Sequence, residues 1–326
     1  MQFIALNESF ELVSFLSPLL VQWNRKYYEC GDFEIEIQHK QYLNEMKYVY
    51  TKDRPEIGII NKVVYDKDKV TLKGYFLNKI LDDKIVYPTY YGSGEITQTL
   101  MRMINANKED IRIDSYNLLN GSKVDFQSTG DEVGKKLYEV LATQEMSYNL
   151  SYDYVNDLFV FSFSKGEDKT VGDDIVVFST KFKNLSEPIL NDDDSEFKNY
   201  ALVAGTGKAD ERIYTSIDLS NGRHKKQLFV DARDMKQEEQ SLEQYMAELN
   251  QRGLEKLAEH QVRHDISFKL IGKSDDYRKR YDLGDKVVII LSDINKKYEV
   301  RIIGIYEVFK DGMHTFDIEV GNMKGV

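Results

Sequence analysis

Two runs near the end of the sequence decide the fold: Val300-Arg301-Ile302-Ile303-Gly304-Ile305-Tyr306-Glu307-Val308-Phe309 and Thr315-Phe316-Asp317-Ile318-Glu319-Val320. Apolar and polar residues alternate through much of both runs, as in strands with one buried face. Between them lies the turn Lys310-Asp311-Gly312, and Asp-Gly is a strong hairpin signal because it tolerates positive φ. Another strand, Lys286–Ile290, follows Gly284-Asp285, and Gly321 closes the pattern. The sequence therefore predicts a hairpin beside a third strand.

A similar pattern occurs near the beginning of the sequence. Gly31-Asp32 opens the run Phe33–Ile37, and the runs Ile57–Tyr65 and Val70–Lys73 meet at the turn Asp66-Lys67-Asp68, with Gly74 after them. Finding the pattern twice predicts two related β domains in one chain. Two similar domains per subunit can form a ring whose apparent symmetry exceeds its number of subunits.

Composition restricts the class of protein. A chain of 326 residues is too long for one ordinary core, so two or three domains are expected. The aromatic residues are mainly 22 Tyr and 16 Phe, which favours β structure. The single cysteine, Cys30, excludes an internal disulfide and a cysteine-rich metal site. A net charge of −11 opposes general nucleic-acid binding. It would suit a surface that nucleic acid passes without adhering, although solubility alone explains the sign more simply.

The sequence contains no signal for a membrane. No run approaches the roughly 20 apolar residues of a membrane-spanning helix. The first residues, Met1-Gln2-Phe3-Ile4, do not have the pattern of a signal peptide. We therefore expect a protein that is made and folded in a cytoplasm.

The pattern changes twice along the chain. Residues 1–88 consist almost wholly of strand patterns, which predicts a β sandwich or barrel. Residues 89–170 predict a small α+β domain with two helices, one capped by Ser93 and one opened by a capping box of Thr129 and Glu132. A hairpin of Tyr148–Tyr152 and Leu158–Phe163 ends this domain.

Strand patterns return in residues 171–326. Predicted strands there include 175–178, 199–204 and 212–216. A long helix at about 237–260, within an insertion of about 235–263, interrupts them. Gly253 lies inside this helix and weakens it by about 1 kcal/mol relative to alanine, so the helix is expected to depend on packing.

Three motifs that could bind ligands are better explained structurally. Gly205-Thr206-Gly207-Lys208 lacks the spacing of a phosphate-binding loop and predicts a turn after a strand. His260 and His264 would share a helix face and could hold zinc, but no third ligand accompanies them, and we favour a solvated helix end. The acidic run Asn191–Glu196 lacks the glycine and the alternating ligands of a calcium loop, so a solvated loop is expected.

Cys30 and Trp23 are candidates for a reactive thiol and for an aromatic contact surface, respectively. Cys30 has no basic cluster or helix N-terminus beside it, so a reactive thiolate is not expected. Trp23, near Arg25, Tyr27 and Tyr28, is either part of an aromatic contact surface or a core anchor, and we favour the core. The sequence therefore predicts no catalytic residues, no cofactor and no metal.

Four segments in order resemble phage tail-tip hub proteins. They are the opening run Trp23–Ile35, the mid-chain run Val177–Leu185 with its Asn184-Leu185 pair, the strand Asn199–Gly205 that begins with Asn, and the aromatic-Asp-Leu-Gly-Asp signature Tyr281–Val287. The resemblance covers nearly the whole chain. The family is that of siphophage hub proteins from prophages of Gram-positive bacteria, related to the baseplate hub of contractile tails.

The resemblance implies a mainly β fold with α+β insertions, containing two tail-tube-like β-barrel domains and a small α+β domain. The expected boundaries are 1–88 for the first barrel, 89–170 for the α+β domain and 171–326 for the second barrel. It also implies a homotrimer, a ring with pseudo-sixfold symmetry that joins the tail tube to the tip. DNA and the tape-measure protein would pass through this ring without specific binding.

The implied partners are the tail tube or distal tail protein, the tape-measure protein, and tip or receptor-binding proteins. The implied location is the tail tip of a virion or phage-like particle; phage, prophage and bacteriocin-like particle, and siphophage and contractile tail, stay open. Many hubs of this kind continue into a wall-degrading or receptor-binding region, but this sequence ends at Val326, so we expect another protein to carry that activity. The alternative function is a cell-wall carbohydrate-binding or wall-degrading tip protein. The candidate structural and interface residues are Trp23, Gly31, Asp32, Asp66, Asp68, Gly74, Asn184, Asn199, Asp282, Gly284, Asp285, Asp311, Gly312 and Gly321.

Overall fold

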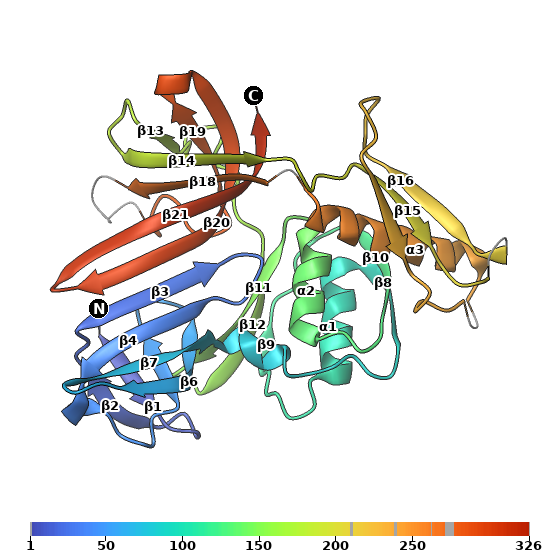
Figure 1. Cartoon of the computed structure of the whole chain (residues 1–326). Coiled ribbons are helices and arrows are strands. Elements are labelled where there is room, and N and C mark those ends of the chain that lie inside the picture. The colour runs from blue at the N-terminus through green and yellow to red at the C-terminus, as the bar shows by residue number, and fades with distance from the viewer. Residues whose placement is uncertain (1, 209–210, 238–239, 262, 271–276, 326) are drawn as a thin grey trace.

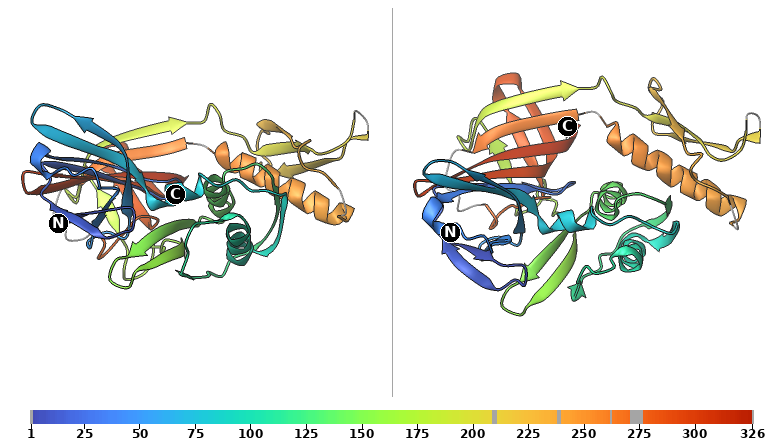
Figure 2. Two further views of the ribbon diagram at one scale, coloured as in Figure 1. Left: turned by 90° about the horizontal axis from the view of Figure 1, so that it is seen from below. Right: turned by 60° about the horizontal axis from the view of Figure 1, so that its bottom comes forward.

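The computed structural model describes residues 2–208, 211–237, 240–261, 263–270 and 277–325 (Figure 1). Two β regions lie on one side of the molecule, and two α/β modules extend away from them (Figures 1 and 2). We call the β regions the N-half (β1–β7) and the C-half (β13, β14 and β18–β21). The middle module contains β8–β12, α1 and α2, and the α3 module contains β15–β17 and α3.

The N-half is an antiparallel array in the order β3-β4-β7-β6-β5-β1-β2. Every second residue of β3 and β4 is buried, as the alternation predicts. Trp23 is 1% exposed and contacts the rings of Phe3, Phe33 and Phe76. It is therefore a core anchor, and the alternative of an aromatic contact surface is wrong. The strands are β1 (Phe3–Leu6), β2 (Leu12–Leu16), β3 (Leu20–Lys26), β4 (Asp32–Gln38), β5 (Tyr48–Thr51), β6 (Ile57–Tyr65) and β7 (Lys69–Phe76).

The C-half has the order β14-β18-β21-β20-β19-β13. Its core includes Ile302, Ile305 and Ile318. Residues 191–193 belong to β14, where they pair with β18, so the prediction of a solvated loop is wrong for them. The strands are β13 (Val177–Ser179), β14 (Leu185–Asp193), β18 (Arg263–Leu270), β19 (Lys286–Leu291), β20 (Lys296–Lys310) and β21 (Met313–Gly325).

The two halves repeat one strand order. Taken along each array, β3-β4-β7-β6-β5-β1 corresponds to β14-β18-β21-β20-β19-β13, and chain order agrees as well. The last pair differs in direction, because β1 and β5 are antiparallel whereas β13 and β19 are parallel. The hairpins β6–β7 and β20–β21 correspond, and both have a register shift just beyond the pairing with β5 or β19, after Ile60 and after Ile302. β20–β21 has a second shift, after Glu299. Gly31-Asp32 opens β4, whose counterpart is β18, whereas Gly284-Asp285 opens β19, whose counterpart is β5. Matching the two Gly-Asp strands to each other was therefore wrong, although the repeat itself exists.

A pairing between β3 and β20 joins the halves into one sheet of 13 strands. The described strands of one chain form this continuous open sheet and do not close into two barrels. The two barrel domains of the sequence-based prediction therefore stay unconfirmed, while the mainly β class is confirmed.

The middle module contains both helices expected between residues 89 and 170. Glu95 caps α1 by accepting a hydrogen bond from the Gln98 N–H, so Ser93 is not the cap. α2 starts after its N-cap residue Glu132 and has no side-chain cap, so the predicted capping box of Thr129 and Glu132 is absent. Thr129 lies three residues before the N-cap, and its hydroxyl donates to Thr89. The elements are β8 (Tyr90–Glu95), α1 (Ile96–Asn107), β9 (Ser115–Tyr116), β10 (Lys123–Ser128), α2 (Val133–Ala142), β11 (Ser147–Asp153) and β12 (Leu158–Ser164).

The α3 module is inserted between β14 and β18, and it has a small sheet of its own that the sequence did not separate from the C-half. This sheet contains β15 (Tyr200–Ala204), β16 (Tyr214–Asp218) and β17 (Gln227–Asp231), and α3 (Leu242–Glu259) packs on it. A Cβ on Gly253 would lie 2.1 Å from Ile217 Cδ1, so the glycine permits this close packing.

Other features of this region are also resolved. The chain turns after β15, where the Gly205 N–H donates to the Ile213 carbonyl, which agrees with the predicted turn at Gly205-Thr206-Gly207-Lys208. His260 caps the end of α3 and His264 belongs to β18, so the two histidines do not share a helix face. No described helix is long and apolar enough to cross a membrane.

Candidate functional site

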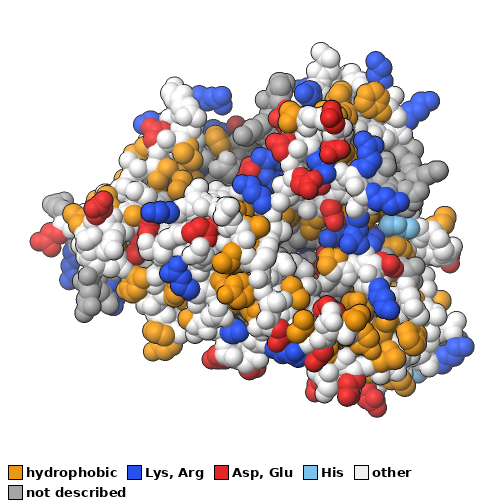
Figure 3. Space-filling model, turned by 180° about the vertical axis from the view of Figure 1, so that it is seen from behind, with side chains coloured by type: hydrophobic (Ala, Val, Ile, Leu, Met, Phe, Trp, Pro, Cys, Tyr) orange, Lys and Arg blue, Asp and Glu red, His pale blue; other side chains and the backbone are white. Residues whose placement is uncertain are grey.

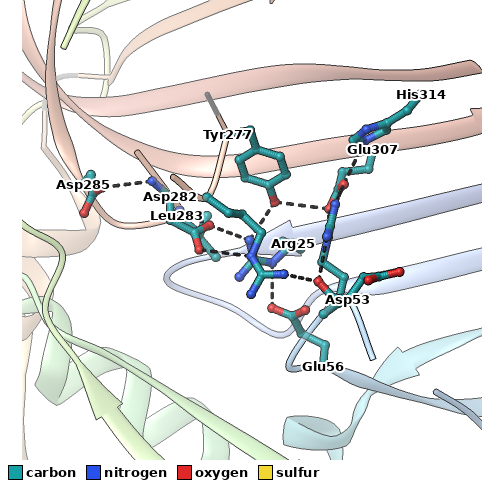
Figure 4. Close-up of polar contacts among 11 residues, drawn as sticks. Arg25, Asp53, Glu56, Tyr277, Asp282, Leu283, Asp285, Glu307 and His314 are labelled. Carbon is teal, nitrogen blue, oxygen red and sulfur yellow. Dashed lines mark hydrogen bonds and ion pairs between the residues drawn. The ribbon is translucent and has the colours of Figure 1, made fainter. Parts of the chain in front are cut away.

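The junction between the halves contains a buried network of charged and polar side chains. β3 from Leu20 to Lys26 pairs with β20 from Lys310 back to Gly304. Two strands far apart in the sequence therefore share a ladder, and the core faces of both halves meet behind it. Charged side chains lie on that buried face (Figure 4).

Arg25 of β3 is the centre of the first part of the junction and is 6% exposed. Its Nε contacts Glu56 at 2.6 Å, and its Nη1 contacts Asp282 at 2.6 Å and the Tyr277 hydroxyl at 2.7 Å. Burial opposes the charge of Arg25, but Glu56, Tyr277 and Asp282 outweigh it and raise the pKa of the guanidinium. Arg25 thus connects the N-half, through Glu56, to the C-half.

Glu307 of β20 is the centre of the second part and is fully buried. Arg54 Nε donates to its Oε1 at 2.7 Å and Arg54 Nη2 contacts its Oε2. His314 Nε2 lies 2.9 Å from Oε2, and the Tyr277 hydroxyl donates to Oε1 at 3.2 Å. Burial favours the neutral acid, but the contacts with Arg54 and His314 prevail and lower the pKa of Glu307 to about 2. Glu307 is therefore ionised at neutral pH.

A third contact connects the C-half to the middle module. Arg301 is 1% exposed; its Nη2 contacts Glu145 at 2.8 Å and its Nη1 donates to the Gly284 carbonyl. Lys286 Nζ also contacts Glu145, at 2.7 Å. Tyr27, at the end of β3, donates its hydroxyl to the Glu145 carbonyl at 3.1 Å. Both halves and the middle module therefore meet around Glu145.

The Asp282-Leu283-Gly284-Asp285 signature forms a turn at this junction. Asp285 accepts a hydrogen bond from the Asp282 N–H at 2.9 Å, and Asp282 accepts one from the Leu283 N–H at 2.7 Å. Gly284 has φ of +93°, and a Cβ there would lie 2.3 Å from Tyr27. A glycine is therefore required both by backbone conformation and by space.

Comparison with known proteins identifies the family. A sequence profile described as Siphovirus ReqiPepy6 Gp37-like protein matches residues 16–322. The chain belongs to this family. The resemblance to a family of siphophage proteins is thus confirmed.

Solved structures of phage tail proteins share the fold of this chain. The prophage MuSo2 43 kDa tail protein of Shewanella oneidensis has a TM-score of 0.61 and 13% identity, with 98% of each chain covered. The prophage tail protein gp18 of Listeria monocytogenes has 0.59 and 14%, covering 99% of this chain and 94% of that one. A tail protein of Neisseria meningitidis has 0.62 and 11%, covering 98% and 96%. No curated protein sequence matches this chain significantly.

The two hairpin turns that contain candidate interface residues lie at the same end of the sheet. Asp66 and Asp68 are exposed at the β6–β7 tip, and Asp311 and Gly312 are exposed at the β20–β21 tip. The register runs from Lys310 to Leu20, from Leu20 to Glu36, and from Glu36 to Thr71, next to the first tip. The views of Figures 1 and 2 show both tips pointing the same way. Their role in an interface stays a prediction.

The remaining candidate residues have local structural contacts. Asp32 accepts a hydrogen bond from Asn24 at 2.7 Å. Asn184 bridges backbone groups of Val177 and Ser179, and Asn199 bridges those of His224 and Lys226. Gly31, Gly74 and Gly321 are positions where a Cβ would lie within 3 Å of a neighbouring atom.

The described residues contain no set that indicates catalysis. Burial raises the pKa of Cys30 to about 12, so its thiol is poorly reactive, as predicted. Within the described ranges, no group of three or more His, Cys, Asp or Glu residues could hold a metal ion. The chemistry of the junction is that of ion pairs holding separate regions together.

Sequence reasoning identified Asp282, Gly284 and Asp285 but missed Arg25, Arg54 and Glu307. A signal was present, since Arg25 and Glu307 occupy the apolar phase of their alternating strands. A charge at such a position indicates a buried ion pair. Its partners could not be assigned, because Arg54 and Glu307 are 253 positions apart.

Proposed function

We propose that this tail protein is a structural hub of the tail tip. In this proposal three copies form a ring by pairing sheet edges, and DNA and the tape-measure protein pass through its centre. One observation carries the proposal. The pairing of β3 with β20 joins the two halves within one chain, and the corresponding strands, β14 and β6, have edges that no described strand covers.

The contact made within the chain is the pairing of β3 with β20. The counterpart of β3 in the C-half is β14, and the counterpart of β20 in the N-half is β6. β14 pairs with β18 on one side, and no described strand pairs with its other side. β6 pairs with β5 only at residues 57–59, so the second edge of Asn61–Tyr65 faces no described strand. Unpaired edges of this kind favour strand addition.

The register of the internal junction predicts the register between copies. The shift after Ile60 corresponds to the shift after Ile302, so Lys62 corresponds to Gly304 and Val64 to Tyr306. Asn24 lies opposite Asp32, and residue 191 lies opposite Asp265. Asp32 of β4 and Asp265 of β18 occupy corresponding register positions, so residue 191 corresponds to Asn24. Because Tyr306 lies opposite Asn24, Val64 would lie opposite Asn191 of the partner subunit. Lys62 would then face Asp193 of the partner subunit, which adds an opposite-charge pair.

Repeating this head-to-tail contact leads to a closed ring when the rotation closes. Two corresponding halves per copy give six repeats in a ring of three, which is the pseudo-sixfold arrangement that the resemblance to hub proteins implies. The tail tube or distal tail protein would meet one end of such a ring.

The open sheet face supports a channel that DNA passes without adhering. The opposite face of β7, β4, β3 and β20 carries the core, so the open face is the one available to a channel. Its carboxylates are largely matched by lysines: Glu34 contacts Lys73 and Glu36 contacts Lys69, each at 2.5 Å. The face is therefore mixed in charge instead of uniformly acidic. Lys69 and Lys73 are paired, and Lys62, opposite Lys73, would face Asp193 of the partner subunit in the ring, which leaves few cations for phosphate.

A disulfide between copies tests the ring. We expect the double variant Val64→Cys, Asn191→Cys to form covalent dimers and trimers under mild oxidation, because directly opposed strand residues have Cβ atoms about 4.5–5.5 Å apart. Denaturing electrophoresis would detect them, and electron microscopy would show rings with a central hole. Cys30 is only partly buried, so the single variants Val64→Cys and Asn191→Cys serve as controls for disulfides that it could form.

The matched control is Val64→Cys with Ser195→Cys, because Ser195 lies four residues beyond Asn191 and outside disulfide reach in this register. Oligomers in solution that fail to crosslink at 64 and 191 would reject the proposed edge pairing. A chain that stays monomeric at high concentration by light scattering would reject self-assembly of the isolated protein.

A further inference from the structure

An open pocket of about 750 Å³ lies at the end of the sheet where the two halves meet. Five separate segments form it: β1, the start of β3, the β5–β6 loop, residues 277–279 and the β20–β21 tip. Neither β14 nor β6 lines it, so the ring proposed above would leave it open.

The rim of this pocket is basic, although the whole chain has a net charge of −11. Lys52, Lys279 and Lys310 are exposed and come from three different segments. None of the three forms an ion pair with a described residue, in contrast to the paired lysines of the open sheet face. On the face opposite to that of Figure 1, several basic side chains lie beside a histidine in the right half of the view (Figure 3). Three unpaired cations around one hollow indicate an anionic ligand.

The floor of the pocket is apolar. Phe3 and Val21 are buried beneath it, and the ring of Phe309 stacks on His314 with centroids 4.2 Å apart. Met313, at the tip, is 66% exposed beside them. Methionine adapts its shape to different apolar groups, and an exposed one beside an aromatic floor suits an inserted side chain.

The base of the pocket is held rigid by the junction. Arg54 and His314 line the pocket and both contact the buried carboxylate of Glu307. Arg54 also lies over the Tyr277 ring, 5.3 Å from its centroid. A site whose base is fixed in this way loses little conformational entropy on binding.

We propose that this pocket binds an acidic peptide segment with an aromatic or aliphatic residue, supplied by another protein. The lysines would contact the carboxylates and the floor would receive the apolar side chain. A peptide fits better than a nucleic acid, because Asp53 and Asp311 also line the pocket and the lysines surround it instead of following a groove. Both hairpin tips lie at this end of the sheet, so the site would act in end-on docking.

The probe is a short fluorescein-labelled peptide of Glu and Asp residues with one central Phe, titrated with the full-length protein by fluorescence anisotropy. The test variant is Lys52→Glu, Lys279→Glu, Lys310→Glu. The control variant, Lys123→Glu, Lys165→Glu, Lys208→Glu, changes the net charge equally at exposed lysines outside the pocket. We expect the affinity to fall at least about tenfold for the test variant and to change by less than about twofold for the control.

A second comparison tests the floor. Met313→Ala should weaken binding of the Phe peptide but not of the same peptide with Ala in place of Phe. Equal weakening by both triple variants would show diffuse charge attraction and overturn the proposal. So would undetectable binding of the wild-type protein, or tighter binding of a single-stranded oligonucleotide than of the peptide.

Discussion

The N-half and the C-half have the same strand order but differ in how their outer edge is finished. In the N-half, the edge strand β3 is covered by β20, and the contact is supported by the buried charges of Arg25 and Glu307. In the C-half, no described strand covers the outer side of β14. The same strand order thus forms a junction within the chain at β3 and, by the proposal above, a junction between copies at β14.

The comparison also shows that topology can repeat without repeating the residues. Trp23 fills the N-half core, and its counterpart by register in β14 is Leu190. The C-half carries the α3 module between β14 and β18, where the N-half has only the short turn between β3 and β4. The strands therefore conserve pairing order, while the cores and insertions differ.

The largest effect is expected from Glu307→Gln, which breaks the internal junction. The substitution retains the shape of the side chain but removes the charge that compensates the buried Arg54. Removing one partner of a buried ion pair commonly destabilises by about 3–5 kcal/mol, because the other charge stays buried. The free energy of unfolding from urea denaturation measures the loss.

Glu34→Gln is the control, since Glu34 pairs with the half-exposed Lys73 on the open face, and the expected loss is within about 1 kcal/mol. The pKa of Glu307 is lowered to about 2 in the fold, below its unfolded value of about 4.3. Its stabilisation is thus full above the unfolded value and is lost as the pH falls through about 2. Similar losses for both variants would refute a special role of the junction.

Local sequence signals located the hairpins but not their neighbours. Alternation with a turn placed β6, β7, β20 and β21 to within a few residues, because strand period and turn chemistry are local properties. Which strand lies beside β7 depends on tertiary packing, and for that reason the Gly284-Asp285 strand was matched to β4 instead of β5. Ser93 was chosen as a helix cap because Glu95, which caps through its carboxylate, is a weaker local signal.

The sequence predicted only part of the candidate site, for a similar reason. Asp282 and Asp285 were found because a short turn signature contains both of them. Arg25 gave a hint through its phase in β3, but its ion pair with Asp282 spans 257 positions. An electrostatic partner at that separation exists only once the two halves have paired.

A smaller effect is expected in the α3 module, the insertion that distinguishes the C-half. Glu248 of α3 is 5% exposed, and its Oε2 has no hydrogen-bond partner among the described residues. Burial raises its pKa to about 7, and nearby Asp125 of β10 adds to the shift. The neutral acid is therefore the form that the fold favours, and ionisation opposes packing against the middle module.

Because the pKa of Glu248 is raised in the folded protein, the folded state loses stability as the pH rises. The contribution of Glu248 to stability is complete below its unfolded value of about 4.3 and is lost as the pH rises through about 7. Glu248→Gln should thus match the wild type near pH 4 and exceed its stability at pH 8 by on the order of 2–3 kcal/mol. Thermal denaturation across this pH range measures the difference, with the exposed Glu243→Gln as control. Parallel pH curves for Glu248→Gln and the wild type would contradict the assignment.

The smallest effect distinguishes the two hairpin tips. Gly312 has φ of +75°, and a Cβ there would meet no atom within 4 Å, so Gly312→Ala tests backbone conformation alone. The expected loss is about 1 kcal/mol, because alanine disfavours positive φ. Lys67→Ala in the β6–β7 tip should change stability by less than about 0.5 kcal/mol, since none of Asp66, Lys67 and Asp68 has positive φ. Gly312→Asn should lie between them, because asparagine tolerates positive φ better than alanine does. Chemical denaturation measures these losses of stability. Equal losses for Gly312→Ala and Lys67→Ala would contradict the expectation that the positive φ of Gly312 makes the β20–β21 tip more sensitive than the β6–β7 tip.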